Sequence, residues 1–224
     1  MNLPIYIPLI FILTTGLTFF LFLKAASYSK TVALMMASWL LFQGVLSYLE
    51  FYTHIDTEPQ RFLLAAPPAL LIILGVFILK KGRRWVAGLD IKTLTILHSV
   101  RIPVELLLYC LFLQKVIPEL MTFAGRNFDV LAGITAPFVY YFGFVKNKMG
   151  SKGILLWNVS CLFLLLNIVI NAILSVPAPF QQLAFEQPNI AILYFPIIWL
   201  PTFVVPVVLF SHLVAIKRFY MSVA

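Results

Sequence analysis

The sequence predicts an all-α integral membrane protein, a seven-transmembrane-helix bundle with its N-terminus outside and its C-terminus cytoplasmic. The first observation is composition: hydrophobic residues make up 62% of the 224 residues and charged residues only 11%. Soluble domains are about 45–50% apolar and about 25% charged. A chain this apolar cannot cover itself with polar surface, so its expected partner is the lipid bilayer.

The second observation is seven apolar segments, each near the length of about 20 residues that a spanning helix needs. They cover residues 3–23, 31–52, 62–79, 93–114, 128–145, 154–176 and 190–216. Helices are expected because lipid offers no hydrogen-bond partner to an open backbone. The first segment has no basic residue before it, so it is interpreted as a helix and not as a signal peptide. Residues 1–224 are therefore predicted to form a single transmembrane domain.

The third observation is the distribution of lysine and arginine, which favours the cytoplasmic side of membrane proteins. Twelve of the 16 basic residues fall in alternate loops and in the C-terminal tail, and three fall on the other side: Arg61, Lys115 and Arg126. This asymmetry predicts the stated orientation, in a plasma membrane or bacterial inner membrane. The basic residues form short clusters between apolar segments, so the net charge of +8 does not indicate a nucleic-acid partner.

The fourth segment contains the most unusual residues, because His98, Arg101 and Glu105 interrupt its apolar sequence. At about 100° per residue they share one face of a helix and form a polar stripe about 10 Å long. A charge at mid-bilayer costs on the order of 3 kcal/mol, so the stripe should face the bundle interior or a wet cavity. Pro103 removes one backbone N–H and is expected to kink the helix there.

Three interpretations of this stripe remain open. Arg101 and Glu105 form a structural ion pair at i and i+4, although this order of the charges is the less favourable one. Alternatively, Arg101 binds the polar group of a ligand. In the third interpretation Glu105 carries a proton, tuned by its burial and by Arg101.

A second cluster precedes the fifth segment. Asn127 is suited to cap the helix, and Asp129 falls in the first turn, where the helix dipole favours an acid. Arg126 is expected to pair with Glu105, Glu119 or Asp129. Six carboxylates are expected at or near the outer face: Glu50, Asp56, Glu58, Glu119, Asp129 and Glu186. They are interpreted either as an acidic vestibule that attracts cations or amines, or as ordinary solvated loop residues.

Two asparagines in the sixth segment, Asn167 and Asn171, lie at i and i+4 on one face. They are interpreted either as contacts that hold helices together or as part of the lining of the cavity at Glu105. The Pro-rich loop 176–189 is expected to lie on the membrane surface as a lid. The seventh segment contains three prolines at intervals of five residues, which predicts a kinked or broken helix: Pro196, Pro201 and Pro206.

Signatures of soluble enzymes and of cofactor sites are not found. There is no metal-binding spacing, since His54, His98 and His212 are expected at different levels of the bundle, and no phosphate-binding loop. No cofactor and no metal are therefore expected. Cys110 and Cys161 lie in apolar segments and are interpreted as buried thiols.

Three families of similar size do not match in their motifs. Microbial rhodopsins need a lysine in the seventh helix, and this chain has none there before Lys217. The seven-span sugar transporters contain a triple-helix repeat that is not found. The small integral-membrane terpene cyclases are similar in length and number of spans only, so no family is assigned.

The leading hypothesis is that the protein binds or transports a lipid or another small amphipathic ligand through an outward-facing polar cavity around Arg101 and Glu105. The expected ligand-binding residues are His98, Arg101, Arg126, Asn127, Asn167 and Asn171. An intramembrane enzyme acting on a lipid or isoprenoid is the alternative, with Glu105, Asp129 or Glu50 as the catalytic acid. A third hypothesis is a structural or assembly subunit. The sequence does not indicate an oligomeric state.

Overall fold

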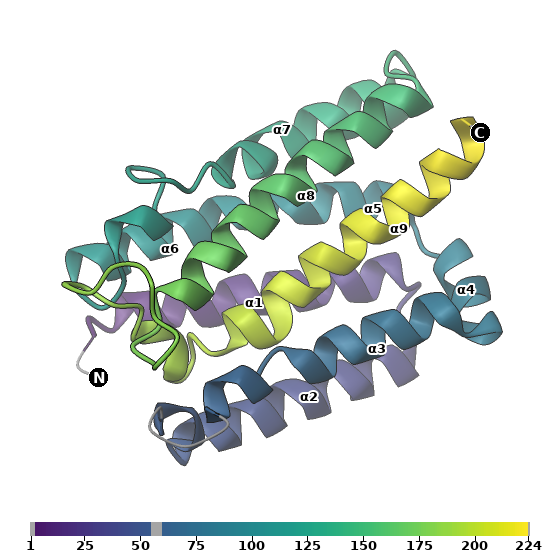
Figure 1. Ribbon diagram of the computed structural model, residues 1–224. Coiled ribbons are helices and arrows are strands. Elements are labelled where there is room, and N and C mark those ends of the chain that lie inside the picture. The colour runs from purple at the N-terminus through teal and green to yellow at the C-terminus, as the bar shows by residue number, and fades with distance from the viewer. Residues whose placement is uncertain (1–2, 55–59, 224) are drawn as a thin grey trace.

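The computed structural model describes residues 3–54 and 60–223, and all regular structure in this part of the chain is helical. The long helices run side by side in an elongated bundle (Figure 1). The α-helices are α1 (Tyr6–Ala25), α2 (Lys30–Tyr48), α3 (Pro67–Ile78), α4 (Lys80–Ala87), α5 (Ile91–Leu97), α6 (Arg101–Leu113), α7 (Val130–Tyr140), α8 (Ser151–Leu174) and α9 (Val205–Val223).

Six helical segments are long and apolar enough to cross a membrane, which confirms the prediction of a helical, membrane-type bundle. They are Tyr6–Ala25, Lys30–Tyr48, Arg61–Ile78, Ile91–Leu113, Ser151–Leu174 and Leu200–Ser222. A shorter apolar helix, Val130–Val145, occupies the fifth predicted segment. It consists of α7 and a following π-helical turn, Tyr141–Val145.

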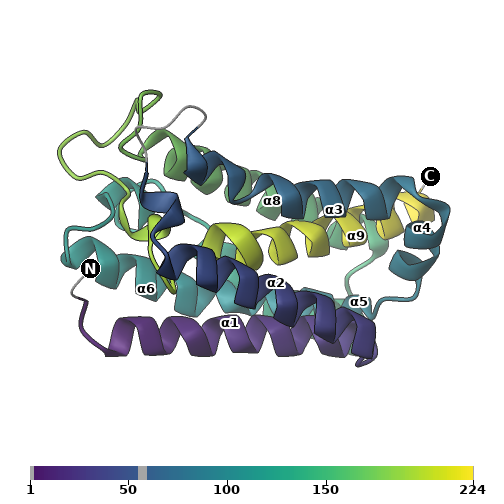
Figure 2. The ribbon, with the colours of Figure 1, turned by 90° about the horizontal axis from the view of Figure 1, so that it is seen from below.

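Helix α9 is the central element of the bundle. It packs along α8 and also contacts α5 and α3, whereas α1 packs against α5 and α6. Seen from below, α9 lies between α1 on one side and α3 and α8 on the other, with the two chain termini at opposite ends (Figure 2). We call the end that holds α4 and the C-terminus the basic end, and the end that holds the N-terminus the opposite end.

Local sequence explains where several helices begin. The Ser29 side chain accepts a hydrogen bond from the backbone of Val32 and caps α2. Asp90 caps α5 in the same way, through the backbone N–H groups of Lys92 and Thr93. Pro67 and Pro68 occupy the first turn of α3, where a missing N–H costs nothing.

The seventh predicted segment is broken, as its prolines predicted, and its helix begins later than expected. Residues 194–198 are not helical, and the long helix that follows includes Leu200 and runs to Val223 instead of residue 216. Pro201 lies in the first turn of the π-helical part, where few backbone N–H groups have intrahelical partners. Pro206 lies farther inside the helix, and the carbonyl of Thr202, four residues before it, accepts the indole N–H of Trp39 instead. The helix therefore lies deeper toward the basic end than the sequence indicated.

The fourth segment changes helix type at its polar stripe. A short 3-10 turn, His98–Val100, joins α5 to α6 just before Pro103. Proline removes the hydrogen bond to the carbonyl four residues earlier, and a tighter turn accommodates that loss. The kink predicted at Pro103 is thus observed as a change from α-helix to 3-10 helix, which starts at His98.

The loop 176–189 lies beside the ends of α6 and α8 at the opposite end of the bundle. The Gln187 amide donates to the carbonyls of Phe112 and Ile117, and the Asn189 amide donates to the carbonyl of Ala172. These bonds fix the loop against the bundle. Its predicted position on the membrane surface stays a prediction.

Candidate functional site

The polar stripe of the fourth segment faces the bundle interior, as predicted. His98, Arg101 and Glu105 are 1%, 3% and 2% exposed, respectively. Arg101 and Glu105 therefore need partners from other helices, because an isolated charge in such surroundings costs several kcal/mol.

Arg101 pairs with Asp129 and not with Glu105. Its Nη1 lies 3.1 Å from the Oδ1 atom of Asp129, which is the only ion pair within the described residues. The predicted i,i+4 pair of Arg101 and Glu105 is therefore wrong. Asp129 is the N-cap residue directly before α7, and this position brings its carboxylate up to the guanidinium from a separate helix.

A histidine on α9 binds the other side of Arg101. The Nη2 atom of Arg101 lies 2.9 Å from Nε2 of His212, and Nδ1 of His212 lies 2.9 Å from Oδ1 of Asn158 on α8. Arginine can only donate, so Nε2 accepts and Nδ1 carries the hydrogen that Asn158 Oδ1 accepts. The Asn158 amide nitrogen in turn donates to the carbonyl of Ile154. His212 is thus held neutral, in one tautomer.

The two buried histidines stack on each other. The ring centroids of His98 and His212 are 3.9 Å apart with an angle of 18° between the planes, and Trp157 packs edge-on against His98 at 5.5 Å. The expectation that His98 and His212 lie at different levels is therefore wrong. Because α9 extends to Val223, His212 lies in the middle of its helix and at the depth of His98. Within the part of the chain that is described, no three metal-ligating side chains come together.

Glu105 has a separate partner, Asn127. The Asn127 amide nitrogen donates to Oε1 of Glu105 and to the carbonyl of Met121, and its oxygen accepts the backbone N–H of Asp129. Asp129 occupies the N-cap position of α7 but its side chain makes no capping hydrogen bond, whereas the Asn127 oxygen accepts a backbone N–H at the start of this helix and its amide nitrogen reaches Glu105. The second oxygen of Glu105, Oε2, is buried and has no hydrogen-bond partner among the described residues.

Charge does not balance at this site. Arg101 can neutralise one carboxylate and is paired with Asp129, whereas Glu105 has only a neutral amide. A second buried carboxylate of this kind is either protonated or neutralised from outside the protein. Glu105 is therefore the carboxylate of this site that has no counter-charge among the described residues. The Nδ1 atom of His98 and the Nε atom of Arg101 also have no hydrogen-bond partner there.

Glu105 and Asp129 both line an apolar cavity of about 350 Å³. Its other walls are side chains of the segment before α3, α3 itself, α6, α8 and the start of α9, among them Phe62, Leu108 and Ala172. Arg101 does not line it, so the cavity is apolar with an acidic patch and differs from the polar cavity predicted around Arg101. The reason is that Asp129 and His212 together cover the guanidinium.

The cavity opens between α3 and α8, on the side of the bundle. Several of its lining side chains are themselves exposed on these two walls: Leu63 and Leu70 on the α3 side and Leu166 and Ile173 on α8. All four are apolar, as expected for a surface that faces lipid tails.

The remaining predicted residues lie outside this cavity. Glu50 is exposed, at the end of α2. Arg126 has no ion pair among the described residues, so its predicted salt bridge is not observed, and only its backbone carbonyl accepts a bond from the Asn167 amide. Asn171 donates to Asn167, so these two hold α8 to the segment before α7 and do not line the cavity. Two of the predicted vestibule acids, Asp56 and Glu58, lie outside the described residues.

Gly133 lets α7 approach α6 at the ion pair. A Cβ at this position would lie 3.0 Å from Cγ1 of Ile102, 3.1 Å from its backbone nitrogen and 3.2 Å from Cβ of Arg101. Gly133→Val is therefore expected to push the two helices apart and cost about 1–3 kcal/mol of stability. Thermal unfolding in detergent measures the loss, and Gly16→Val, where a Cβ meets open space, is the control. Equal melting temperatures for both variants would contradict the close packing.

Two members of the site, Asn158 and His212, were not predicted. Both are buried polar residues within long apolar helices, which is the same signal that identified His98. The sequence alone could have identified both residues as candidates by that criterion. It could not show which residue of another helix each of them binds.

The chain belongs to a family that is described as a domain of unknown function (DUF8737), which matches residues 59–220. The matched range contains the whole buried network and every residue that lines the cavity at Glu105. No curated protein and no solved structure matches the chain.

Proposed function

We propose that the protein binds an amphipathic, lipid-like ligand that enters its apolar cavity from the membrane and places its polar group at Glu105. The observation that carries this proposal is the free Oε2 atom of Glu105 at the wall of an apolar cavity of about 350 Å³. Ligand sites are typically apolar cavities of roughly 300–1,000 Å³ with a few polar groups that orient the ligand. Transport of the ligand across the membrane would use the same site.

The polar group of the ligand follows from the chemistry of Glu105. An ionised carboxylate offers acceptors only, and Asn127 already donates to one oxygen. A hydroxyl or an amine would donate to the other oxygen, and an ammonium would also supply the missing positive charge. The apolar walls favour a single hydrocarbon chain or an isoprenoid behind this group.

The proposed topology has seven crossings, an outside N-terminus and a cytoplasmic C-terminus, in a plasma membrane or bacterial inner membrane. The six long helices and Val130–Val145 together give an odd number of crossings, and the termini lie at opposite ends of the bundle (Figure 2). The basic end holds twelve lysines and arginines by this topology, which favours the cytoplasmic side. The Glu105 cavity then lies in the outer half of the membrane.

The test is mass spectrometry of small molecules that copurify with the wild type and with Glu105→Gln. We expect Glu105→Gln to fold. The amount of ligand that copurifies with it should be about one tenth of the wild-type amount or less, because a hydrogen bond to a charged group contributes about 1.5–3 kcal/mol. Ala172→Trp, which fills the cavity, should remove the same molecule. Glu119→Gln, an exposed carboxylate at the same end, is the matched control. Retention of the molecule by Glu105→Gln at the control level would overturn the proposal.

An intramembrane enzyme is the second candidate, and the unequal surroundings of the two carboxyl groups favour it. Asp129 is paired with Arg101, whereas Glu105 has a free oxygen at the same cavity wall. Two carboxyl groups in such different surroundings can divide the acid and base roles of a reaction. In that case the wild type would copurify with two molecules related by one chemical step, and Glu105→Gln with the substrate alone.

A further inference from the structure

A second apolar cavity, of about 430 Å³, lies at the other side of α9 and is lined by α2, α3 and α4 as well as by the end of α1. We call it the α2–α3 groove. Two of its lining residues, Met35 on α2 and Ile72 on α3, are 57% and 52% exposed, so it opens to the membrane between these helices. It shares only Pro206 with the lining of the Glu105 cavity, and α9 separates the two.

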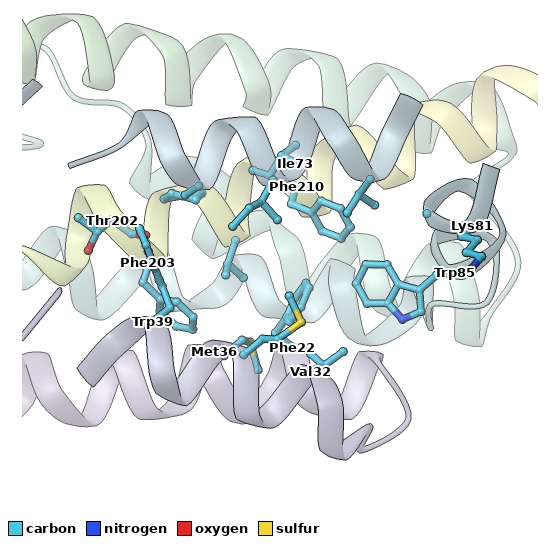
Figure 3. A pocket seen from close by; sticks show the side chains of 17 residues that line it. Phe22, Val32, Met36, Trp39, Ile73, Lys81, Trp85, Thr202, Phe203 and Phe210 are labelled. Atoms are coloured by element: carbon cyan, nitrogen blue, oxygen red, sulfur yellow. The ribbon is translucent and has the colours of Figure 1, made fainter. Parts of the chain in front are cut away.

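The groove has one polar end. Figure 3 shows apolar and aromatic side chains along its length, with Lys81 and Trp85 of α4 at one end and Thr202 and Trp39 at the other. At the Thr202 end the polar groups satisfy each other, since the Trp39 indole N–H donates to the carbonyl of Thr202 at 2.8 Å. At the α4 end the Lys81 ammonium and the Trp85 indole N–H have no acceptor among the described residues.

Helix α4 is fixed in this position by the chain itself. Gly82 allows its first turn to fold back on α3, because a Cβ there would lie 2.3 Å from the carbonyl oxygen of Val76. The indole of Trp85 packs 5.8 Å from the ring of Phe210 on α9. The helix that carries the two donors is therefore held in place, and their position does not depend on a loose loop.

Charge at this end has no internal counterpart. Lys80, Lys81, Arg83 and Arg84 of α4 are all exposed. Asp90 is the acid of this end among the described residues, and its oxygens are engaged by the backbone of Lys92 and by the hydroxyl of Thr93. An anion would complement these cations, and basic residues beside a membrane helix attract anionic lipids.

We propose that the α2–α3 groove binds an anionic phospholipid of the leaflet that borders the basic end. One acyl chain lies among Met36, Ile73 and Phe203, and the phosphate accepts hydrogen bonds from Lys81 and Trp85. The groove matches this occupant in three ways: it opens to lipid, it is apolar along its length, and its two unpaired donors lie at the depth of the headgroups. This lipid is distinct from the ligand at Glu105.

The test compares binding of phosphatidylglycerol and phosphatidylcholine to the full chain in detergent micelles. Phosphatidylglycerol with brominated acyl chains is expected to quench the fluorescence of Trp39 and Trp85, and phosphatidylcholine to do so less. Lys81→Gln should lower the affinity for phosphatidylglycerol about five-fold, which corresponds to about 1 kcal/mol for one lysine near the headgroups. It should leave the affinity for phosphatidylcholine unchanged.

Two further variants keep this test decisive. Lys148→Gln removes an exposed charge of the same end outside the groove and should bind both lipids as the wild type does. Ala69→Phe fills the middle of the groove and should reduce quenching by both lipids. Equal affinity of the wild type for the two lipids, or an equal loss in Lys81→Gln and Lys148→Gln, would overturn the proposal.

Discussion

Asp129→Ala is expected to destabilise the protein by about 3–5 kcal/mol, because it leaves the Arg101 guanidinium buried without its counter-charge. Arg101 is 3% exposed and has its ion pair with Asp129 alone. A loss of this size corresponds to a fall in melting temperature of about 10 °C or more for a chain of this length. Thermal unfolding of the purified protein in detergent, followed by tryptophan fluorescence, provides the measurement.

The double variant Arg101→Leu with Asp129→Leu separates an unpaired charge from lost packing. Replacement of both members of a buried ion pair by apolar residues is often neutral, whereas removal of one member is costly. The double variant should therefore be more stable than Asp129→Ala. If the two variants unfold at the same temperature, the ion pair is not the source of the loss.

His212→Phe is expected to cost about 3 kcal/mol, although phenylalanine preserves a ring that can stack on His98. The change removes the acceptor of the Arg101 Nη2 group and the donor to Asn158, so two buried polar groups lose their partner. Each unsatisfied group costs about 1–3 kcal/mol. The same unfolding experiment in detergent measures the effect.

A double-mutant cycle with Asn158→Leu tests this explanation. Asn158 and His212 share one hydrogen bond, so their effects should not add, and the coupling should be at least about 0.5 kcal/mol. Additive effects would show that the hydrogen bond between His212 and Asn158 contributes little, and that the loss in His212→Phe comes from the Arg101 group that it leaves without an acceptor.

Much of the fold could be predicted from the sequence because lipid restricts the choice to long apolar helices. The positions of the segments were correct to within a few residues for the first six, and the prolines identified the break in the seventh. The start of that helix at Leu200 could not be predicted, because the sequence does not show how far a proline-rich segment continues in non-helical form. This shift also placed His212 at the depth of His98.

The candidate site was predicted only in part. Helical periodicity correctly placed His98, Arg101 and Glu105 on one inward face, since periodicity is a local property of the chain. The choice of partner is not local: Arg101 pairs with Asp129 from α7 and His212 from α9 in preference to Glu105, four residues away. Sequence spacing therefore identified the charges but not which of them remains without a counter-charge.

The partners of Arg101 have a consequence for how the chain is made. Asp129 and His212 follow Arg101 by 28 and 111 residues, so α6 is synthesised well before either of them. Placing a lone arginine at the centre of a helix in lipid costs about 2.5–3.5 kcal/mol on insertion scales. Entry of α6 into the bilayer is therefore completed by later parts of the nascent chain, and a polypeptide truncated before α9 would keep a guanidinium that is only half satisfied. A chain that ends before α9 is therefore expected to insert α6 less completely than the full-length chain does.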